Sequence, residues 1–163
     1  MIIRKAELRD LERLTEIFNY EVLNGTASFC IQPKTVRERL GWFEEHSGGT
    51  HPLIVAEADG DVAGYASLST YREYEAYDGS VELSVYVDHR QRGKRIGWAL
   101  MEEILKLARE NEKIHTVISV ITGNNDVSIR MHEALGFRYC GSLTEVGEKF
   151  GKKLDVAFYE MLV

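Results

Sequence analysis

A cluster of basic residues is the first feature of this sequence that could do chemistry. Four of the six residues from Arg90 to Arg95 are Arg or Lys, although the 163-residue chain has a formal net charge of -6. Gly93 lies among them and an amphipathic pattern begins at Ile96, so the segment predicts a turn that enters a helix. Unpaired N–H groups, the helix dipole and basic side chains would together attract a pyrophosphate. The segment is neither GxxxxGK[ST] nor GxGxxG, and an ordinary solvated basic turn remains an alternative.

Glu82 is the second candidate, this time for proton transfer. It shares the polar face of a predicted strand with Ser84 and Tyr86, whereas the residues between them are apolar. A carboxylate on a central strand is costly unless it is hydrated, ion-paired or functional. The pattern therefore leaves two interpretations open, a general base and a partner of a nearby Arg or Lys.

Metal chemistry is not expected. The histidines have no ligand spacing, and the two cysteines form no CxxC pair. These residues are His46, His51, His89, His115, His132, Cys30 and Cys140.

Alternating strands and helices must position these residues. Strands are predicted at Ile2–Lys5, Leu53–Ala58, Val62–Thr70, Val81–Val87, Thr116–Thr122 and Asp155–Leu162. Helices are predicted from Leu11 to Val22 after Asp10 as N-cap, over Thr35–Glu45, from Ile96 to Arg109, and over Asp126–Leu135 with Gly136 as the C′ residue. The continuous β-branched run Thr116–Thr122 predicts a strand buried on both faces. No repeat or linker interrupts the pattern, so residues 1–163 are expected to form one α/β domain.

Composition excludes several classes of protein. The acidic balance, with a pI near 5.4, argues against a general nucleic-acid binder, which needs excess Lys and Arg. No stretch approaches the roughly 18 to 20 apolar residues of a membrane span. Glu7 and Asp10 interrupt the N-terminus too early for a signal peptide. With two cysteines expected to be reduced, we expect a cytoplasmic protein.

Three segments together resemble the GNAT superfamily of acetyltransferases. Arg92-Gly93-Lys94-Arg95-Ile96-Gly97 resembles its coenzyme A loop [QR]xxGx[GA], and Asn125–Phe137 resembles its final coenzyme-binding helix, NxxSxxxHExLGF. Val81–Val87 resembles the VExSVYV strand of the branch that contains the phosphinothricin and methionine-sulfoximine N-acetyltransferases. Further matches at Asn24–Phe29, Glu75–Tyr77 and 147–155 extend the similarity over almost the whole chain.

The resemblance implies the GNAT fold of the α/β (α+β) class. That fold has a central mixed, mostly antiparallel twisted sheet flanked by helices, here in the order β-α-α-β-β-β-α-β-α-β. It also implies acetyl-CoA as co-substrate and no metal. The implied coenzyme-binding residues are Val85, Tyr86, Val87, Arg92, Gly93, Lys94, Arg95, Ile96, Gly97, Trp98, Asn125 and Ser128.

The resemblance further implies a direct transfer of the acetyl group to a primary amine. Glu82 would remove the amine proton, directly or through water, and His132 would protonate the departing thiolate. Backbone N–H groups near Val85 and Tyr86 would polarise the thioester carbonyl, on a strand that splays from its neighbour. For His132 alone, an ordinary packed or surface histidine is the alternative.

The implied acceptor is a small amino-acid-like amine such as methionine sulfoximine, methionine sulfone or phosphinothricin. Arg72 would grip its carboxylate, although an ordinary surface ion pair is the alternative for this residue. The implied acceptor-binding residues are Phe29, Arg72, Tyr74, Glu75, Ala76, Tyr77 and Lys149. Lys149 and Phe150 would complete the acceptor site, and a second subunit could supply them, because this branch commonly forms homodimers.

Two other functions remain open at the sequence level. One keeps the chemistry but changes the acceptor to a protein N-terminus or a polyamine. The other is a non-catalytic acetyl-CoA-binding module, against which Glu82 argues. The sequence also departs from the family at three positions: Arg95 replaces the usual glycine, His132 a frequent tyrosine, and Tyr74 an arginine frequent in phosphinothricin acetyltransferases.

Overall fold

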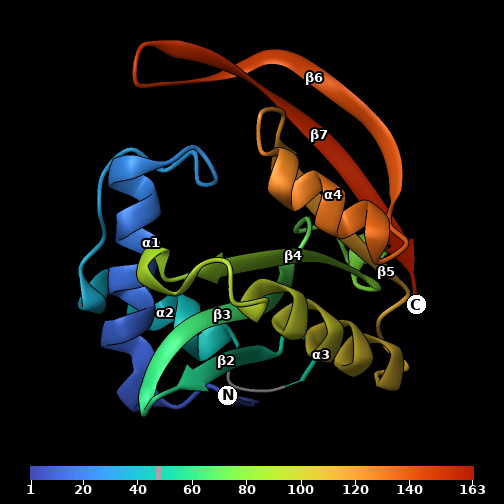
Figure 1. Ribbon diagram of the computed structural model, residues 1–163. Coiled ribbons are helices and arrows are strands. Elements are labelled where there is room, and N and C mark those ends of the chain that lie inside the picture. The colour runs from blue at the N-terminus through green and yellow to red at the C-terminus, as the bar shows by residue number, and fades with distance from the viewer. Residues whose placement is uncertain (47–48) are drawn as a thin grey trace.

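The computed structural model describes residues 1–46 and 49–163, and its described part contains one seven-stranded sheet (Figure 1). The strands lie in the order β1-β2-β3-β4-β5-β7-β6. Only β4 and β5 are parallel, and every other neighbouring pair is antiparallel. The strands are β1 (Ile2–Lys5), β2 (Leu53–Ala58), β3 (Asp61–Thr70), β4 (Ser80–Val87), β5 (Thr116–Thr122), β6 (Arg138–Lys149) and β7 (Lys152–Leu162). The predicted mixed, mostly antiparallel sheet is confirmed.

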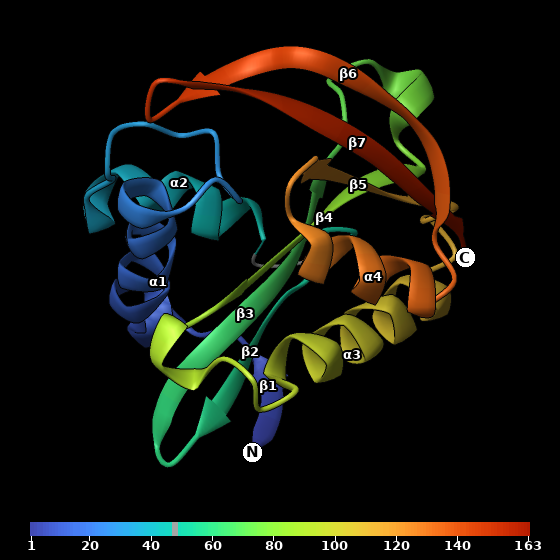
Figure 2. The same ribbon diagram turned by 45° about the horizontal axis from the view of Figure 1, so that its top comes forward.

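Helices cover both faces of this sheet (Figures 1 and 2). One face packs against α1 (Leu11–Asn24) and α2 (Val36–Glu45), and the other against α3 (Ile96–Glu110) and α4 (Asp126–Ala134). Short 3-10 turns at Leu8–Asp10, Glu75–Tyr77 and His89–Gln91 complete the elements. None of the helices in the described ranges is long and apolar enough to cross a membrane.

Local sequence explains where the helices begin and end. Thr35 and Glu38 form a reciprocal capping box at the start of α2. Gly136 follows α4 with φ +95°, a conformation that favours glycine. Asp10 does precede α1 as predicted, but its side chain caps no α1 amide and instead accepts hydrogen bonds from the Glu7 N–H and from Arg4.

Two details differ from the prediction. The expected order has one strand after the last helix, whereas the structure has both β6 and β7. Nearly all of β6 is exposed, and its register with β7 shifts twice. A strand exposed on both faces has no apolar alternation by which to recognise it. Thr116–Thr122 is also not buried on both faces, because Val120 is 37% exposed.

The exposure of Val120 has the same origin as the main irregularity of the sheet. Strands β4 and β5 pair only from Ser80 to Glu82, with Thr116 to Ile118 as partners. Beyond Glu82, β4 continues to Val87 beside β3 and diverges from β5. This confirms the expected splay, which leaves one edge of β4 free to bind a ligand.

Candidate active site

A cavity of about 750 Å³ lies where the splayed strand, the turn before α3, the end of α1 and the start of α4 meet. Every predicted coenzyme-binding residue except Lys94 lines it. The lining residues are Glu21, Thr26, Ala27, Val85, Tyr86, Val87, Gln91, Arg92, Gly93, Arg95, Ile96, Gly97, Trp98, Asn124, Asn125, Val127, Ser128 and Met131. Segments from four parts of the sequence therefore form one continuous site.

The N-terminus of α3 opens into this cavity. Arg95 is the N-cap residue, and no side chain caps the helix. The first helical bond runs from the Ala99 N–H to the Arg95 carbonyl at 3.1 Å. The N–H groups of the preceding residues, Ile96, Gly97 and Trp98, consequently have no partner within the helix. Such a group of amides at the positive end of a helix dipole binds a phosphate well.

The backbone at Arg95 explains why the sequence pattern leads one to expect glycine at this position. Its φ of +62° lies in the left-handed region, as does the φ of +79° at Gly93. A non-glycine residue pays a steric cost there. The arginine can nevertheless adopt the turn, and its guanidinium lies 5.9 Å from the Trp98 ring at the cavity wall.

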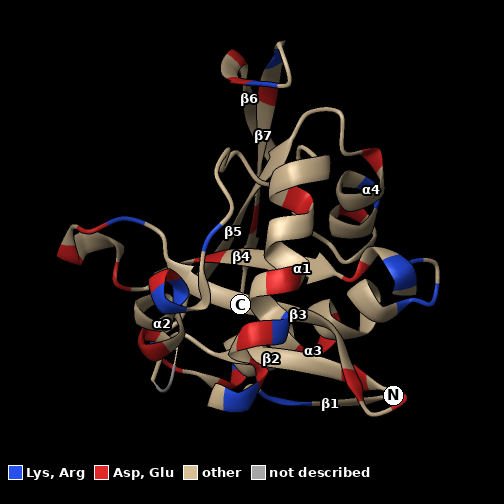
Figure 3. Ribbon diagram, turned by 90° about the vertical axis from the view of Figure 1, so that its left-hand side faces the viewer, with Lys and Arg blue, Asp and Glu red and all other residues tan. Residues whose placement is uncertain are grey.

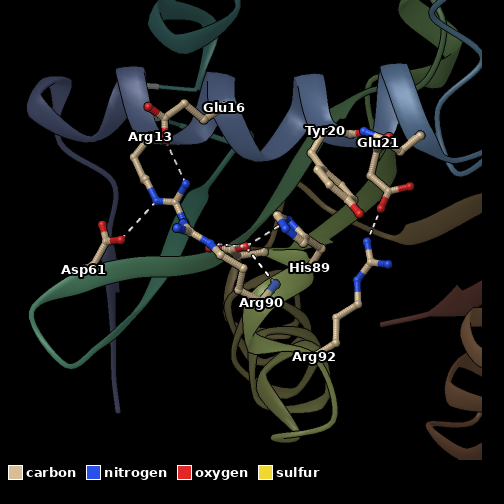
Figure 4. A network of polar contacts seen from close by, with 10 residues as sticks. Arg13, Glu16, Tyr20, Glu21, Asp61, His89, Arg90 and Arg92 are labelled. Carbon is tan, nitrogen blue, oxygen red and sulfur yellow. Dashed lines mark hydrogen bonds and ion pairs between the residues drawn. The ribbon is translucent and has the colours of Figure 1, made fainter.

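The basic residues of the turn are not equivalent. Arg90 binds Asp88 at 2.8 Å, and Arg92 pairs with Glu21 of α1 (Figure 4). Lys94 donates to the Gln91 side chain at 2.6 Å. Arg90 therefore belongs to the scaffold, whereas Lys94 and Arg95, which pair with no carboxylate among the described residues, can contribute charge toward a phosphate.

Asp88 anchors the turn to α1. It pairs with both Arg13 and Arg90, and its carboxylate also lies 3.3 Å from the His89 imidazole. Burial alone would raise the pKa of Asp88, but the hydrogen bonds from Arg90 and the charge of Arg13 outweigh it and lower that pKa. The His89 ring also stacks on Tyr20 with 3.7 Å between centroids. The ion pair of Arg92 with Glu21 joins the same two elements, and Figure 3 shows the acidic segments of α1 in red.

The hydrogen-bond ladder of β4 identifies which of its backbone groups face the open edge. The Asp88 N–H donates to the Ala63 carbonyl of the neighbouring strand at 2.9 Å. In an antiparallel ladder, alternate residues direct both backbone polar groups to the same edge. Tyr86 therefore bonds to β3, whereas the N–H groups of Val85 and Val87 face the splay. Of the two predicted oxyanion donors, only Val85 lies on the open edge.

Glu82 is the last β4 residue that pairs with β5, so it lies where the splay begins. Its side chain is half-buried. Burial raises the pKa of Glu82, and the positive charge of Arg72 opposes that increase. A carboxyl group with a raised pKa is a stronger base than an exposed glutamate.

His132 is 4% exposed and both of its ring nitrogens are bound. Nδ1 lies 2.7 Å from the Ser128 carbonyl, and Nε2 lies 2.9 Å from the Ser119 hydroxyl. Burial lowers the pKa of His132, and the bond to the Ser128 carbonyl offsets part of that decrease. The imidazole also lines a cavity of about 70 Å³ within the splay, together with Ser84 and Val85.

The predicted acceptor residues are less closely assembled. Arg72, Tyr74, Glu75, Ala76 and Tyr77 are all exposed, and none of them lines the cavity of about 750 Å³ or the one of about 70 Å³. Arg72 is close enough to Glu82 for their charges to interact.

Phe29 and Lys149 belong to a different assembly. Phe29 packs against Gly147, where an added Cβ would lie 2.4 Å from the ring. Lys149 is 4% exposed, and its ammonium donates to the carbonyls of Ser28 at 2.8 Å and Glu21 at 3.3 Å. These contacts hold the loop after α1 against the β6–β7 hairpin, so the ammonium of Lys149 is committed to backbone carbonyls, whereas Arg72 is exposed.

The comparison with known families decides the class of protein. Residues 14–137 match the Acetyltransferase (GNAT) family. This chain belongs to the GNAT acetyltransferase family. Its relatives include the L-methionine sulfoximine/L-methionine sulfone acetyltransferase of Pseudomonas aeruginosa, which is 38% identical over 160 residues, covering 98% of this chain and 92% of the relative.

Solved structures agree with this assignment. The phosphinothricin acetyltransferase of Sinorhizobium meliloti, solved in complex with acetyl-CoA, has a TM-score of 0.95 and 36% identity, covering 99% of this acetyltransferase and 88% of that chain. A Brucella melitensis protein named ribosomal-protein-alanine N-acetyltransferase has a TM-score of 0.96 and 39% identity, with full coverage of both chains.

Several residues of the acetyltransferase's cavity were not predicted from its sequence. Val127 and Met131 lie four residues apart on α4 and share a helix face, so the periodicity of that helix could have identified them. Glu21 carries no such signal, because it reaches Arg92 across 71 positions of sequence. The others are Thr26, Ala27, Gln91 and Asn124.

No group of three or more His, Cys, Asp or Glu side chains within residues 1–46 and 49–163 is arranged to hold a metal ion.

Proposed function

We propose that this enzyme transfers the acetyl group of acetyl-CoA to the primary amine of a small amino-acid-like acceptor, directly within a ternary complex. Acceptors of the methionine sulfoximine, methionine sulfone and phosphinothricin type fit best. The observation that carries the proposal is the position of Glu82, a half-buried carboxylate with a raised pKa at the start of the splay and within electrostatic range of Arg72. Acetyl-CoA supplies the activated acetyl group when bound.

The cavity fits the coenzyme. Its pyrophosphate would lie on the N–H groups of Ile96, Gly97 and Trp98, where Lys94 and Arg95 add positive charge. The open edge of β4 at Val85 and Val87 would bind the amide-containing arm. The Asn125 side chain caps α4 at the Ser128 N–H, 3.2 Å away, and so holds the opposite wall.

Proton removal is assigned to Glu82. An amine is protonated near neutral pH and must lose its proton before it can attack a carbonyl carbon. The raised pKa matches the base to this task, and the carboxylate acts on the amine directly or through one water molecule. The Val85 N–H, on the free edge of the same strand, would stabilise the negative charge that develops on the thioester oxygen.

His132 is proposed as the acid that protonates the leaving thiolate, and its position beside Val85 and Ser119 supports this role. Its lowered pKa favours the neutral imidazole, which carries one proton. That proton lies on Nδ1, which is bound to the Ser128 carbonyl, and its loss would leave an imidazolate. The acid is therefore the imidazolium, which would give its Nε2 proton to the thiolate and return to the neutral ring with Nδ1 still bound to Ser128.

The acceptor assignment rests on Arg72 together with the names of the relatives. A guanidinium binds a carboxylate through two parallel hydrogen bonds, and a free amino acid presents that carboxylate one carbon from its amine. The N-terminal residue of a protein lacks such a group. Arg72 therefore favours a free amino-acid-like acceptor over the protein N-terminus that the name of the Brucella relative suggests.

We also propose that the enzyme is a cytoplasmic homodimer that inactivates toxic amino-acid analogues. The acceptor residues of a single chain are exposed, which supports completion of the site by a second subunit. The β6–β7 hairpin carries exposed apolar side chains suited to such a contact, including Leu143, Val146 and Phe150.

The proposed function is tested by coenzyme A thiol release across a panel of amines. The panel holds methionine sulfoximine, methionine sulfone, phosphinothricin, a polyamine and a peptide with a free alanine N-terminus. We expect turnover with the first three at kcat/KM at least tenfold above the last two. Preferential turnover of the peptide or polyamine would overturn the acceptor assignment, and no turnover of any amine would overturn the reaction.

Arg72→Ala tests the carboxylate anchor, because removal of a charged hydrogen-bond donor raises the acceptor KM by about tenfold or more. The acetyl-CoA KM is expected to remain within twofold. Arg9→Ala provides a matched control, since Arg9 is an exposed arginine paired with Glu7 outside the site, and neither KM should change.

A further inference from the structure

A second buried histidine lies on the acceptor side of the sheet. His46 follows α2 and is 3% exposed. Its Nδ1 lies 2.6 Å from the Trp42 carbonyl, and its Nε2 lies 2.9 Å from the Ser69 hydroxyl of β3. Neither His46 nor Ser69 has a part in the reaction described above.

These contacts determine where each proton lies. A carbonyl oxygen can only accept a hydrogen bond, so Nδ1 carries the imidazole proton and donates it to Trp42. Nε2 of the neutral ring then has only a lone pair, and the Ser69 hydroxyl must donate to it. Because its single proton is committed to His46, the Ser69 oxygen offers only lone pairs to any other group.

Ser69 lies directly opposite Glu82. The two residues are register partners in the β3–β4 ladder, so their side chains emerge on the same face with Cβ atoms about 5 Å apart. Tyr65 and Tyr86 are register partners farther along the same face, where their rings stack with 5.3 Å between centroids. The candidate base and an oriented hydroxyl therefore face the same space.

We propose that Ser69, oriented by His46, accepts a hydrogen bond from the acceptor amine beside Glu82. This inference rests on the proposed function and adds two residues to it. Ser69 is a substrate-binding residue, and His46 is a positioning residue that acts through it. An amine presents several N–H donors, of which Glu82 receives one and Ser69 another, so that the nitrogen lone pair is directed toward the thioester carbon.

The same arrangement maintains the strength of the base. A hydroxyl free to rotate would donate to the Glu82 carboxylate and stabilise its charged form, which lowers a pKa. His46 prevents this, because it accepts the only proton that Ser69 could offer. The raised pKa of Glu82 is consistent with a carboxylate that has no hydroxyl donor.

Protonation of His46 would reverse this arrangement. With Nε2 protonated, Ser69 would become the acceptor of that bond and would point its own proton toward Glu82 and the amine. The charged and titratable groups around His46 are Glu45, Arg39 and His51. Burial lowers the pKa of His46, the Trp42 carbonyl and Glu45 raise it, and His51 and Arg39 lower it further. The reversal of the Ser69–His46 hydrogen bond therefore takes place on the acid limb of the profile of kcat/KM against pH.

Steady-state kinetics with the best amine of the panel test the binding role. For Ser69→Ala we expect an acceptor KM raised about five- to tenfold, the usual effect of one hydrogen bond, with the acetyl-CoA KM unchanged. Ser69→Thr keeps the hydroxyl on a residue suited to a strand and should remain within twofold of wild type. An acceptor KM for Ser69→Ala within twofold of wild type would overturn the proposal.

The pH profile tests His46 as a positioning residue. At acid pH, log(kcat/KM) for the acceptor rises with pH. In His46→Gln the limiting slope of that rise should be smaller by one, because one protonation step is lost, and a merely structural role would not produce this change. His51→Gln is the matched control, because it removes a neighbouring imidazole that contacts Thr70 rather than Ser69, and its slope should be unchanged. An unaltered slope in His46→Gln would overturn the proposal.

A readout without turnover separates this inference from the proposed function. In the ¹⁵N spectrum of histidine-labelled enzyme, His46 should show a protonated Nδ1 and a hydrogen-bonded, unprotonated Nε2, whose shift changes in Ser69→Ala. A protonated Nε2 at neutral pH would refute the orientation of Ser69. No turnover of any amine by wild type would instead refute the proposed function.

Discussion

The two buried histidines on either side of β4 are bound in the same way. Each donates from Nδ1 to the carbonyl four residues before it, Trp42 for His46 and Ser128 for His132. Each lies 2.9 Å through Nε2 from a strand serine, Ser69 or Ser119. One pair lies beside Glu82 on the proposed acceptor side, and the other lies in the splay on the proposed cofactor side. The same local geometry thus produces an oriented serine at each half of the site.

The two pairs differ in what surrounds them. His132 lies in the splay and lines a cavity with Ser119 and Val85, whereas His46 ends α2 and its ring centroid lies 4.9 Å from that of Trp42. His132 belongs to a recognisable motif, and His46 belongs to none. A histidine–serine hydrogen bond of the same geometry can therefore occur at a position that no sequence motif marks.

The largest expected difference from wild type is in stability. His132→Ala removes two hydrogen bonds and the edge contact with Phe137, whose ring centroid lies 4.9 Å away. We expect the free energy of unfolding to fall by about 3 kcal/mol. His46→Ala should cost a similar amount, and urea denaturation measures both. A loss below about 0.5 kcal/mol in one variant only would show that the two sites are not equivalent.

Replacing each of the two serines by alanine should change the KM of a different substrate. Ser119→Ala is expected to raise the acetyl-CoA KM about three- to tenfold, the effect of one lost hydrogen bond, without changing the acceptor KM. Ser69→Ala should do the reverse. Initial rates with each substrate varied in turn measure both constants, and a change in the same constant for both variants would contradict the assignment of the pairs to opposite sides.

A smaller effect is expected in the pH dependence of stability. The pKa values of both histidines are lowered in the folded state, so the unfolded chain binds protons first as the pH falls below about 6.5. Stability should consequently decrease from pH 6.5 toward pH 5. In the double variant His46→Gln/His132→Gln this decrease should become shallower, as urea titrations at each pH would show, and an equally steep decrease would contradict the burial of both neutral rings.

The smallest effect is expected from a change that touches neither pair. Arg95→Gly relieves a left-handed backbone but adds freedom to the unfolded chain, so the free energy of unfolding should rise by only about 0.5 kcal/mol. The acetyl-CoA KM should change less than threefold, because the N–H groups of the turn remain. A tenfold increase would instead show that the guanidinium itself binds the phosphates.

All but one of the residues that the sequence assigns to coenzyme binding meet in one cavity, whereas those that it assigns to the acceptor do not. Local patterns identify the turn from Arg92 to Gly97 and the α4 face that carries Ser128, because hydrogen bonds and helical spacing act within a few residues. The pairing of Arg92 with Glu21, the opposition of Ser69 to Glu82 and the burial of Lys149 depend on tertiary packing. The strand β6 was missed for a related reason, since an exposed strand has no apolar period.

The most direct test of the account is the acetyl-transfer rate of Glu82→Gln. The substitution keeps the shape of the side chain and removes its ability to accept a proton. We expect acetyl-CoA to bind within twofold of the wild-type Kd while kcat at neutral pH falls by about 100-fold or more. Turnover within tenfold of wild type would contradict Glu82 as the base.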